Sequence, residues 1–250
     1  MTQARLPMLF VAVSLWADDP VALSPRGRAQ SIVRLQPAAG TPRATVVFLP
    51  GDGGWRGAAV TMARMIMTWG YDVYGFDTRK YLEVFSQNGT KLSQSQLADD
   101  LRVLAAQLRG GSPRPIVFVG WSQGAGMAVA AATGSGVKSP IQGVITLGLP
   151  ESAVLGWDWK ATLAIIARHE PDQPVFSVKP LLRGIAPTPV WMIHGSEDEY
   201  TSLEAERVLF EAVSEPKRFD AIAGANHRFD GHQDQLYRSL KAGLEWIVGK

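Results

Sequence analysis

A serine flanked by two glycines stands where a predicted strand turns sharply into a predicted helix. The segment Gly120–Gly124 (Gly-Trp-Ser-Gln-Gly) follows the apolar run 115–119 and precedes the small residues 125–132. A serine on such a strained turn projects its hydroxyl clear of the backbone. The N–H of the next residue, Gln123, opens the helix and can donate to an oxyanion. The pattern predicts Ser122 as a nucleophile; a serine in an ordinary glycine-rich surface turn is the alternative.

A serine nucleophile needs a base to accept its proton and an acid to orient that base. In a mostly parallel sheet such residues follow the carboxyl ends of the strands. Asp198 follows the predicted strand 190–194, and His227 follows the last predicted strand, 218–222. The chain order is then Ser122, Asp198, His227, which is the order expected of an α/β-hydrolase.

Other residues compete for the roles of base and acid. Among the four histidines, only His227 lies in a loop after the last strand with small residues before it. The other three are His169, His194 and His232. For the acid, Asp198 is preferred over three other carboxylates: Glu197, Glu199 and Glu151.

A second glycine-rich segment, Gly51–Trp55 (Gly-Asp-Gly-Gly-Trp), follows a predicted central strand. Acyl transfer needs a second backbone N–H aimed at the oxyanion, and a loop with several glycines can supply it. We assign this N–H to Asp52 or Gly53. The Asp52 carboxylate would then lie near the substrate, where it repels an anionic acyl group and can hold a cationic one. The alternative is that Asp52 only caps the following helix.

A third stretch, 76–81, stands at another strand end and carries Arg79 and Lys80. Both side chains can bind a phosphate or carboxylate on a substrate. The alternative is a pair of solvated surface charges, with Asp77 as the cap of a helix or turn.

The elements that must position these residues form an alternating pattern. Apolar, β-branched-rich runs alternate with helix-like stretches, which is typical of a mostly parallel sheet covered on both faces. The predicted strands are 31–35, 44–49, 72–76, 116–119, 143–147, 190–194 and 218–222. The predicted helices are 57–69, 93–108, 122–132, 203–213 and 233–248.

We expect a single domain over residues 1–250 with one insertion. The segment 151–186 lies between two strands and is too long for a simple connection. It is predicted to be a small inserted cap over the site, and the alternative is a plain crossover helix with ragged ends.

Composition narrows the function classes. The net charge is +2 and no basic run carries interleaved aromatics, so nucleic acid is not an expected partner. Cysteine is absent, which excludes disulfides, thiolate metal sites and a cysteine nucleophile. Residues 1–17 hold an arginine, an apolar stretch and a final alanine, which resembles a secretory signal. An ordinary first strand or helix is the alternative for that segment.

Together these motifs resemble the VirJ/AcvB family of bacterial α/β-hydrolases. The block Gly51–Trp55 is the most specific part of the resemblance. The serine turn continued by Ala125 also fits, as does the run His227–Gly231 after the last strand. Three positions depart from the family pattern without touching the triad: Gln123 replaces a Phe-like residue, Gly126 an aspartate and Arg228 a second histidine.

The resemblance implies an α/β-hydrolase fold, a periplasmic or secreted location and, for some members, hydrolysis of aminoacylated phosphatidylglycerol. With such a substrate, Asp52 would meet the cationic aminoacyl group. Lys80, which replaces an arginine of the family, would meet the lipid phosphate at a membrane surface. We expect the following side chains to contact the substrate: Trp55, Lys80, Tyr81 and Trp121.

The sequence therefore predicts a serine hydrolase that cleaves carboxylic esters. Its expected partner is a small-molecule or lipid ester, and no metal or organic cofactor is implied; no oligomeric state is predicted. A general carboxylesterase or thioesterase is one alternative. A binding or secretion-accessory protein on a hydrolase scaffold is another, because a fold does not establish an activity.

Overall fold

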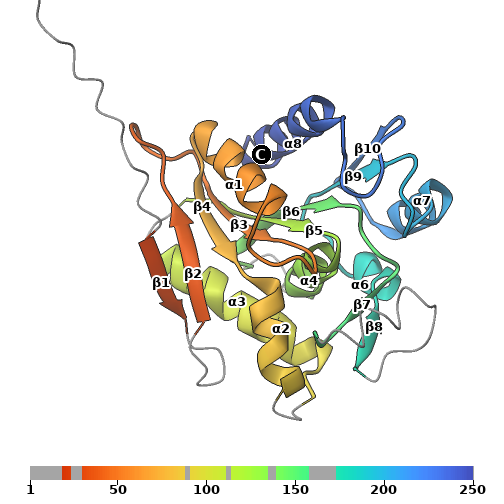
Figure 1. The fold of residues 1–250 in the computed structure, drawn as a ribbon, viewed down its shortest axis with the longest axis horizontal. Helices are drawn as coiled ribbons and strands as arrows, with labels where there is room; N and C mark the ends of the chain where they lie inside the picture. Colours follow the sequence, from red (N-terminus) through yellow and green to blue (C-terminus); the bar gives the residue numbers. More distant parts are fainter. Residues whose placement is uncertain are drawn as a thin grey trace, which may run out of the picture.

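The computed structural model describes residues 19–23, 30–87, 91–110, 114–134, 139–157 and 173–249. An eight-stranded sheet runs through it in the order β1-β2-β4-β3-β5-β6-β9-β10 (Figure 1). Its strands are β1 (Asp19–Leu23), β2 (Gln30–Leu35), β3 (Thr45–Leu49), β4 (Asp72–Phe76), β5 (Ile116–Trp121), β6 (Ile141–Leu147), β9 (Val190–Gly195) and β10 (Lys217–Ile222).

All pairings from β4 to β10 are parallel, whereas β1 and β2 pair antiparallel with their neighbours. The carboxyl ends of the parallel strands therefore share one edge of the sheet, which we call the carboxyl edge. The central strands read as continuous apolar runs because helices cover both of their faces. Every residue of β3, β4 and β9 is buried.

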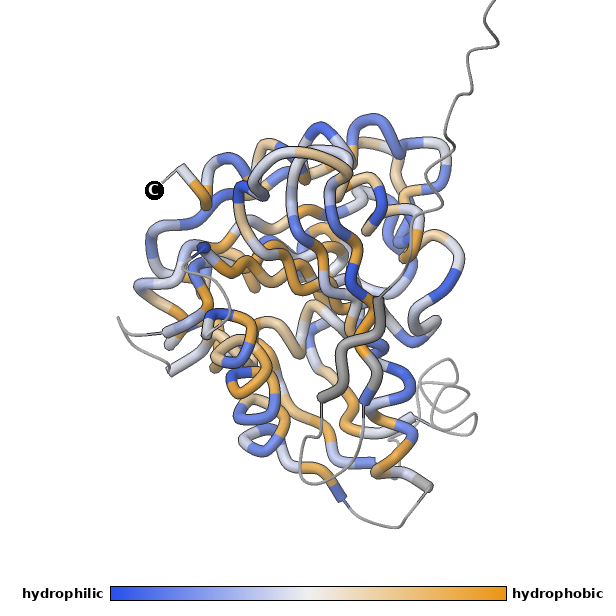
Figure 2. The backbone as a smooth tube through the Cα atoms, turned by 90° about the vertical axis from the view of Figure 1, so that its left-hand side faces the viewer, coloured by the Kyte–Doolittle hydropathy of each residue, from blue (hydrophilic) through white to orange (hydrophobic). Residues whose placement is uncertain are grey.

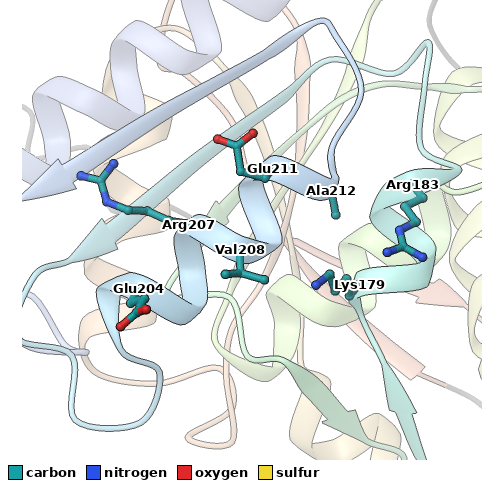
Figure 3. Close-up of a pocket in the computed structure, with 7 residues that line it drawn as sticks. All are labelled: Lys179, Arg183, Glu204, Arg207, Val208, Glu211 and Ala212. Atoms are coloured by element: carbon teal, nitrogen blue, oxygen red, sulfur yellow. The ribbon is translucent and has the colours of Figure 1, made fainter.

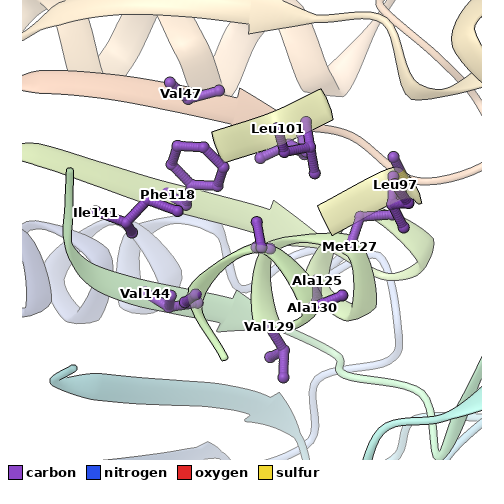
Figure 4. Close-up of a cluster of buried hydrophobic side chains, with 14 of the residues drawn as sticks. Val47, Leu97, Leu101, Phe118, Ala125, Met127, Val129, Ala130, Ile141 and Val144 are labelled. Atoms are coloured by element: carbon purple, nitrogen blue, oxygen red, sulfur yellow. The ribbon is translucent and has the colours of Figure 1, made fainter. Parts of the chain in front are cut away.

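Two apolar clusters lie on opposite faces of the sheet. Alternate residues of β3 belong to different clusters. Val46 and Phe48 lie in the cluster that includes residues of α1 (Ala58–Thr68) and α8 (Gln233–Val248). Val47 of β3 and Phe118 of β5 belong to the other cluster, part of which Figure 4 shows. The helices of that second cluster are α2 (Thr78–Gln87), α3 (Gln94–Gly110), α4 (Gln123–Ala132), α6 (Lys179–Arg183) and α7 (Leu203–Ala212). The tube in Figure 2 shows hydrophobic residues concentrated in its interior.

The seven predicted strands and five predicted helices are confirmed, with ends shifted by a few residues at most. Among the described residues, five further elements were not predicted: β1, α2, α6, β7 (Ser152–Val154) and β8 (Val175–Ser177). The strands β7 and β8 have three residues each, too few to show a period of two. The helix α2 begins directly after a strand, in a stretch interpreted above only for its charges.

Within the predicted cap segment 151–186, β7 pairs antiparallel with β8, and α6 follows. Residues 158–172 and the predicted signal segment 1–17 lie outside the described residues. The cap and the signal therefore stay predictions. None of the helices in the described ranges combines the length and the apolar character that crossing a membrane requires.

Candidate active site

Ser122 occupies a strained turn between β5 and α4, with φ 54° and ψ −121°. Residues other than glycine rarely adopt this conformation, and it clusters at functional sites. The Ser122 N–H donates to the carbonyl of Leu147 on β6 at 2.8 Å. A Cβ on Gly120 would lie 2.4 Å from the Gly124 carbonyl oxygen, and one on Gly124 would lie 2.0 Å from the Leu49 carbonyl oxygen. The turn therefore needs glycine at both positions.

His227 and Asp198 form a buried pair at the carboxyl edge. Nδ1 of His227 lies 2.7 Å from Oδ2 of Asp198. The other carboxylate oxygen accepts the backbone N–H groups of Tyr200 at 2.8 Å and Thr201 at 3.0 Å. Burial alone would raise the pKa of Asp198, but the hydrogen bonds from His227, Thr201 and Tyr200 outweigh it and hold that pKa below its usual value. Asp198 is therefore an anion at neutral pH.

Three neighbours hold the loop that carries His227. The indole Nε1 of Trp121 donates to the His227 carbonyl at 3.2 Å, and the His227 N–H donates to Glu199 at 3.0 Å. The ring of Tyr200 lies edge-on to the imidazole, with centroids 4.8 Å apart. Because Trp121 directly precedes Ser122, the first of these hydrogen bonds couples the serine turn to the histidine loop.

Gly148, directly after β6, brings the parts of the site together. Its φ is +56°, and a Cβ there would lie 3.0 Å from the His227 ring and 3.2 Å from the Asp198 carboxylate. The preceding residue, Leu147, accepts the Ser122 N–H. The structure thus packs the histidine–aspartate pair against the same stretch of backbone that holds the serine.

The glycine-rich loop after β3 runs against the nucleophile. A Cβ on Gly51 would lie 3.0 Å from Cβ and 3.5 Å from Oγ of Ser122. The loop turns through a hydrogen bond from the Gly54 N–H to the Gly51 carbonyl at 3.0 Å. The hydroxyl of Thr78, in the first turn of α2, donates to the Pro50 carbonyl. The loop is thus fixed beside the serine from two sides.

Asp52 projects from this loop as an exposed residue. The protein atoms crowded around its carboxyl raise its pKa, and the nearby His227 opposes that effect. The predicted alternative role as a helix cap is wrong, because α1 begins at Ala58 and is preceded by Gly57, with no side-chain cap. Within the described part of the chain, the Asp52 carboxylate has no hydrogen-bond or ion-pair partner.

Three backbone N–H groups, one on the helix that follows Ser122 and two on the loop after Gly51, have no acceptor among the described residues: those of Gln123, Asp52 and Gly53. Gln123 is the first residue of α4, so its N–H has no intrahelical partner. Free N–H groups beside a nucleophile are what an oxyanion hole requires.

The side chain of Gln123 has a separate role in the structure. Its amide nitrogen donates to the Val154 carbonyl, and its amide oxygen accepts the Val154 N–H at 3.3 Å. A Cβ on Gly126, one turn along α4, would lie 2.9 Å from Cβ of Ala153. The strand β7 is therefore docked directly onto the helix that begins at the nucleophile.

Two of the four predicted substrate contacts are packing residues. The ring of Trp55 lies over Gly75, where a Cβ would come within 2.1 Å of it, and meets Phe48 edge-on at 6.2 Å. Tyr81 is only 1% exposed and its hydroxyl donates to Asp100 at 2.7 Å. The prediction that Tyr81 contacts substrate is therefore wrong, because its ring belongs to the core.

The charged residues at the start of α2 divide in role. Lys80 is exposed, and its ammonium lies 3.9 Å from Asp77, whose carboxylate also accepts the Lys80 N–H. Arg79 pairs with Glu83 at 2.9 Å and stacks 3.5 Å above the ring of Trp157. Arg79 thus connects α2 to the segment after β7. Asp77 caps α2, which is the role that the alternative interpretation of this stretch predicted.

The competing histidines and carboxylates lie elsewhere or act differently. Glu197 and Glu151 are exposed, and His232 hydrogen-bonds the Asp230 carbonyl at 3.0 Å. Glu199 meets the backbone of the histidine loop and not its ring. His169 lies outside the described residues.

Sequence reasoning missed one group behind the pair, Glu206 on α7. It is fully buried and faces His194, which is itself fully buried at the end of β9. The available signal was its spacing, because Glu206 falls three residues after Leu203 and three before Leu209, on the apolar face of the helix.

The described residues contain no group of His, Asp and Glu side chains suited to a metal ion. A shallow groove of about 540 Å³ lies between α6 and α7 (Figure 3). Its lining includes side chains of both charges and none of the triad candidates. The lining residues are Lys179, Arg183, Glu204, Arg207, Val208, Glu211 and Ala212.

The close approach at Gly148 gives a first prediction. Gly148→Ala should displace the His227 ring, lowering kcat/KM at least about tenfold and stability by about 1–3 kcal/mol. Gly134→Ala is the matched control, because Gly134 also has a positive φ but a Cβ there meets nothing within 4 Å. It should lose stability and keep its activity. Steady-state kinetics and thermal unfolding of both variants test this. Equal kcat/KM in the two would contradict the claim that a side chain at position 148 displaces the His227 ring.

The docking of β7 gives a second prediction. Gln123→Ala leaves the buried N–H and carbonyl of Val154 without partners, so the free energy of unfolding should fall by about 1–3 kcal/mol. Gln107→Ala, on the exposed face of α3, should change it by less than about 0.5 kcal/mol. Urea unfolding measures both. An unchanged midpoint in Gln123→Ala would show that the two hydrogen bonds do not stabilise the fold.

Comparison with solved structures identifies the fold as that of the α/β-hydrolases. An esterase domain from Rhodothermus marinus matches with a TM-score of 0.65 at 19% identity, over 92% of this chain and 97% of that one. Est1E from Butyrivibrio proteoclasticus matches with a TM-score of 0.66 at 14% identity, over 92% and 99%. A dienelactone hydrolase from Anabaena variabilis matches with a TM-score of 0.65 at 18% identity, over 94% and 98%.

Curated sequences add two distant relatives. The uncharacterized protein YfhR of Escherichia coli O157:H7 is 24% identical over 78% of this chain and 67% of its own length. The non-reducing polyketide synthase Preu3 of Preussia isomera is 29% identical over 40% of this chain, which corresponds to only 4% of the synthase. The family model described as bacterial virulence protein (VirJ) matches residues 43–245, which include the serine turn, the glycine-rich segment Gly51–Trp55 and the histidine loop. The chain belongs to the VirJ family.

Proposed function

We propose that this protein is a serine hydrolase that cleaves carboxylic esters through Ser122, His227 and Asp198. Oγ of Ser122 attacks the ester carbonyl while Nε2 of His227 takes the hydroxyl proton. The N–H of Gln123 and that of Asp52 or Gly53 donate to the oxyanion that forms. As the C–O bond breaks, His227 returns the proton to the leaving alcohol, and the acyl group remains on Ser122.

The second half of the reaction uses the same groups. Water takes the place of the alcohol and His227 removes its proton, so hydroxide adds to the acyl carbonyl. The proton then passes to Oγ of Ser122, which leaves, and the carboxylic acid is released. Asp198 remains ionised throughout and stabilises the imidazolium that forms twice in the cycle.

The observation that carries this proposal is the 2.7 Å hydrogen bond between His227 and Asp198, packed through Gly148 against the backbone that holds Ser122. The strain at Ser122 adds support, because a merely structural serine gains nothing from φ 54°. The similar structures that are named as esterases and hydrolases point in the same direction. These features argue against a purely binding or secretion-accessory role.

For the substrate class we favour an aminoacyl ester of a phospholipid. Asp52 is an exposed residue whose carboxylate has no partner in the described structure, and it lies on the loop assigned to the oxyanion hole. It suits a cationic aminoacyl group. Lys80 is exposed at the start of α2 and suits a lipid phosphate. Such a substrate would bring the carboxyl edge to a membrane surface, in keeping with a periplasmic location.

A general carboxylesterase or thioesterase is the second candidate. The observation that favours it is the position of Lys80, whose ammonium already has the Asp77 carboxylate 3.9 Å away. A cation that is partly neutralised binds a phosphate less strongly.

Hydrolysis of a substrate panel tests the reaction class. Ser122→Ala should lower kcat by about 10⁴-fold or more on every substrate, because the nucleophile and its base act as a unit. The panel contains short and long p-nitrophenyl esters and lysyl- and alanyl-phosphatidylglycerol in mixed micelles. Near-normal hydrolysis by Ser122→Ala would overturn the assignment of the nucleophile.

Asp52→Asn tests the substrate class. It should lower kcat/KM for lysyl-phosphatidylglycerol about fivefold and leave p-nitrophenyl acetate unaffected, because only the former is cationic. The raised pKa of Asp52 adds a pH signature. Preference for the cationic ester should fall as pH decreases through that pKa, and the variant should lack this fall. Equal effects of Asp52→Asn on both esters would show that Asp52 does not recognise the cationic group of the substrate.

A further inference from the structure

Behind the catalytic pair lies a second pair of titratable side chains that the proposed reaction does not use. His194, near the end of β9, and Glu206, on α7, are both fully buried. Nδ1 of His194 lies 3.8 Å from a carboxyl oxygen of Glu206, and its Nε2 lies 4.0 Å from Oδ2 of Asp198. The four side chains thus form a row from His227 through Asp198 and His194 to Glu206.

The hydrogen bonds of His194 define its tautomer. Nε2 lies 2.9 Å from the carbonyl oxygen of Thr201, which can only accept, so Nε2 carries the hydrogen. Burial, with a smaller contribution from His227, lowers the pKa of His194, although Asp198 and Thr201 oppose this. In the neutral ring Nδ1 is then an acceptor, and it has no donor among the described residues.

Glu206 is the complementary case. The backbone N–H of Leu149 acts on its carboxyl group, but no side chain in the described structure gives either oxygen a hydrogen bond. An ionised Glu206 would be a second buried anion behind Asp198, without a compensating cation. Burial first, and then the charge of Asp198, raise its pKa well above the usual value, and the Leu149 N–H opposes them only in part. An acceptor without a donor therefore faces a carboxyl group that favours keeping its proton.

We propose that Glu206 is a positioning residue that stays protonated and donates its O–H to Nδ1 of His194. A movement of about 1 Å by the carboxyl group closes the 3.8 Å gap to hydrogen-bond length. The bond holds His194 in the tautomer whose Nε2–H faces Thr201 and Asp198. Asp198 is then the sole anion in the row, and its charge is directed at His227.

The groups that act on the Glu206 carboxyl come from β9 and from two loops at the carboxyl edge. His194 faces it from β9, Asp198 from the following loop and the Leu149 backbone from the loop after β6, with His227 beyond Asp198. The consequence for catalysis rests on the proposed function. The protonation of Glu206 does not, so the two can fail separately.

Infrared difference spectroscopy of the whole protein tests the proton directly. At neutral pH the spectrum of the unmodified protein minus that of Glu206→Gln should contain the C=O stretch of a buried carboxylic acid. Glu204→Gln is the matched control, because Glu204 lies on the same helix and is exposed. Its difference spectrum should show only carboxylate bands. A carboxylate band alone in the Glu206→Gln spectrum would overturn the proposal whatever the enzyme does.

The pH dependence of unfolding is a second test. In the folded protein Glu206 keeps its proton, whereas in the unfolded chain it loses it near the usual glutamate pKa. The native state therefore binds more protons above that pKa, and stability falls as pH rises. Glu206→Gln removes this loss, so its Tm relative to the unmodified protein should rise with pH. A difference that is flat in pH, as expected for Glu204→Gln, would contradict a protonated Glu206.

Kinetics test the positioning role. Glu206→Leu removes the donor and should lower kcat about tenfold with little change in KM, whereas Glu206→Gln, which offers an N–H, should recover to within about threefold. The acid limb of kcat/KM should coincide in the Gln variant and the unmodified protein. A shift of the acid limb to lower pH in Glu206→Gln would show that Glu206 carries a charge. Equal activity of Glu206→Leu and Glu206→Gln would show that its hydrogen bond does not contribute to catalysis.

Discussion

Backbone crowding at the carboxyl edge is the constraint on which the site depends. The strand ends and loops approach so closely that a Cβ has no room at Gly124 or Gly195, and at Gly148 it would press on the His227 ring. A Cβ on Gly195, for example, would lie 2.4 Å from the carbonyl oxygen of Ala225 in the loop before His227. Main-chain contacts of this kind leave little freedom for relative movement. The proposed nucleophile, base and acid are therefore placed by the strand ends and the loops that leave them.

Electrostatics then determine the state of each group. The oxygens of Asp198 are satisfied by two backbone N–H groups and the His227 imidazole, so the carboxylate tolerates burial. The acid behind it, Glu206, meets only the Leu149 N–H in the described structure, which does not offset its burial. Two carboxyl groups of the same region thus differ in charge because of their hydrogen bonds. Asp52 is a third case, because its carboxylate has no partner among the described residues and the atoms around it raise its pKa.

The order of elements and the triad candidates could be predicted from the sequence. Parallel strands place their carboxyl ends together, so Ser122, Asp198 and His227 follow from knowing which loop leaves which strand. The contacts that depend on tertiary pairing could not. The place of Tyr81 after a strand end predicts contact with substrate, but its partner Asp100 lies on another helix, and nothing in the local sequence reveals their hydrogen bond. The spacing of Glu206 indicates that it lies on the apolar face of α7. The local sequence does not reveal that this face packs against β9.

Labelling with a fluorophosphonate probe tests the central claim most directly, because the probe reacts only with an activated serine. The account predicts one label per protein, located on Ser122 by peptide mass spectrometry. It also predicts strong slowing in Asp198→Asn and His227→Gln, and no label in Ser122→Ala or in unfolded protein. A folded protein that takes up no label, or that is labelled equally well in Ser122→Ala, would contradict it.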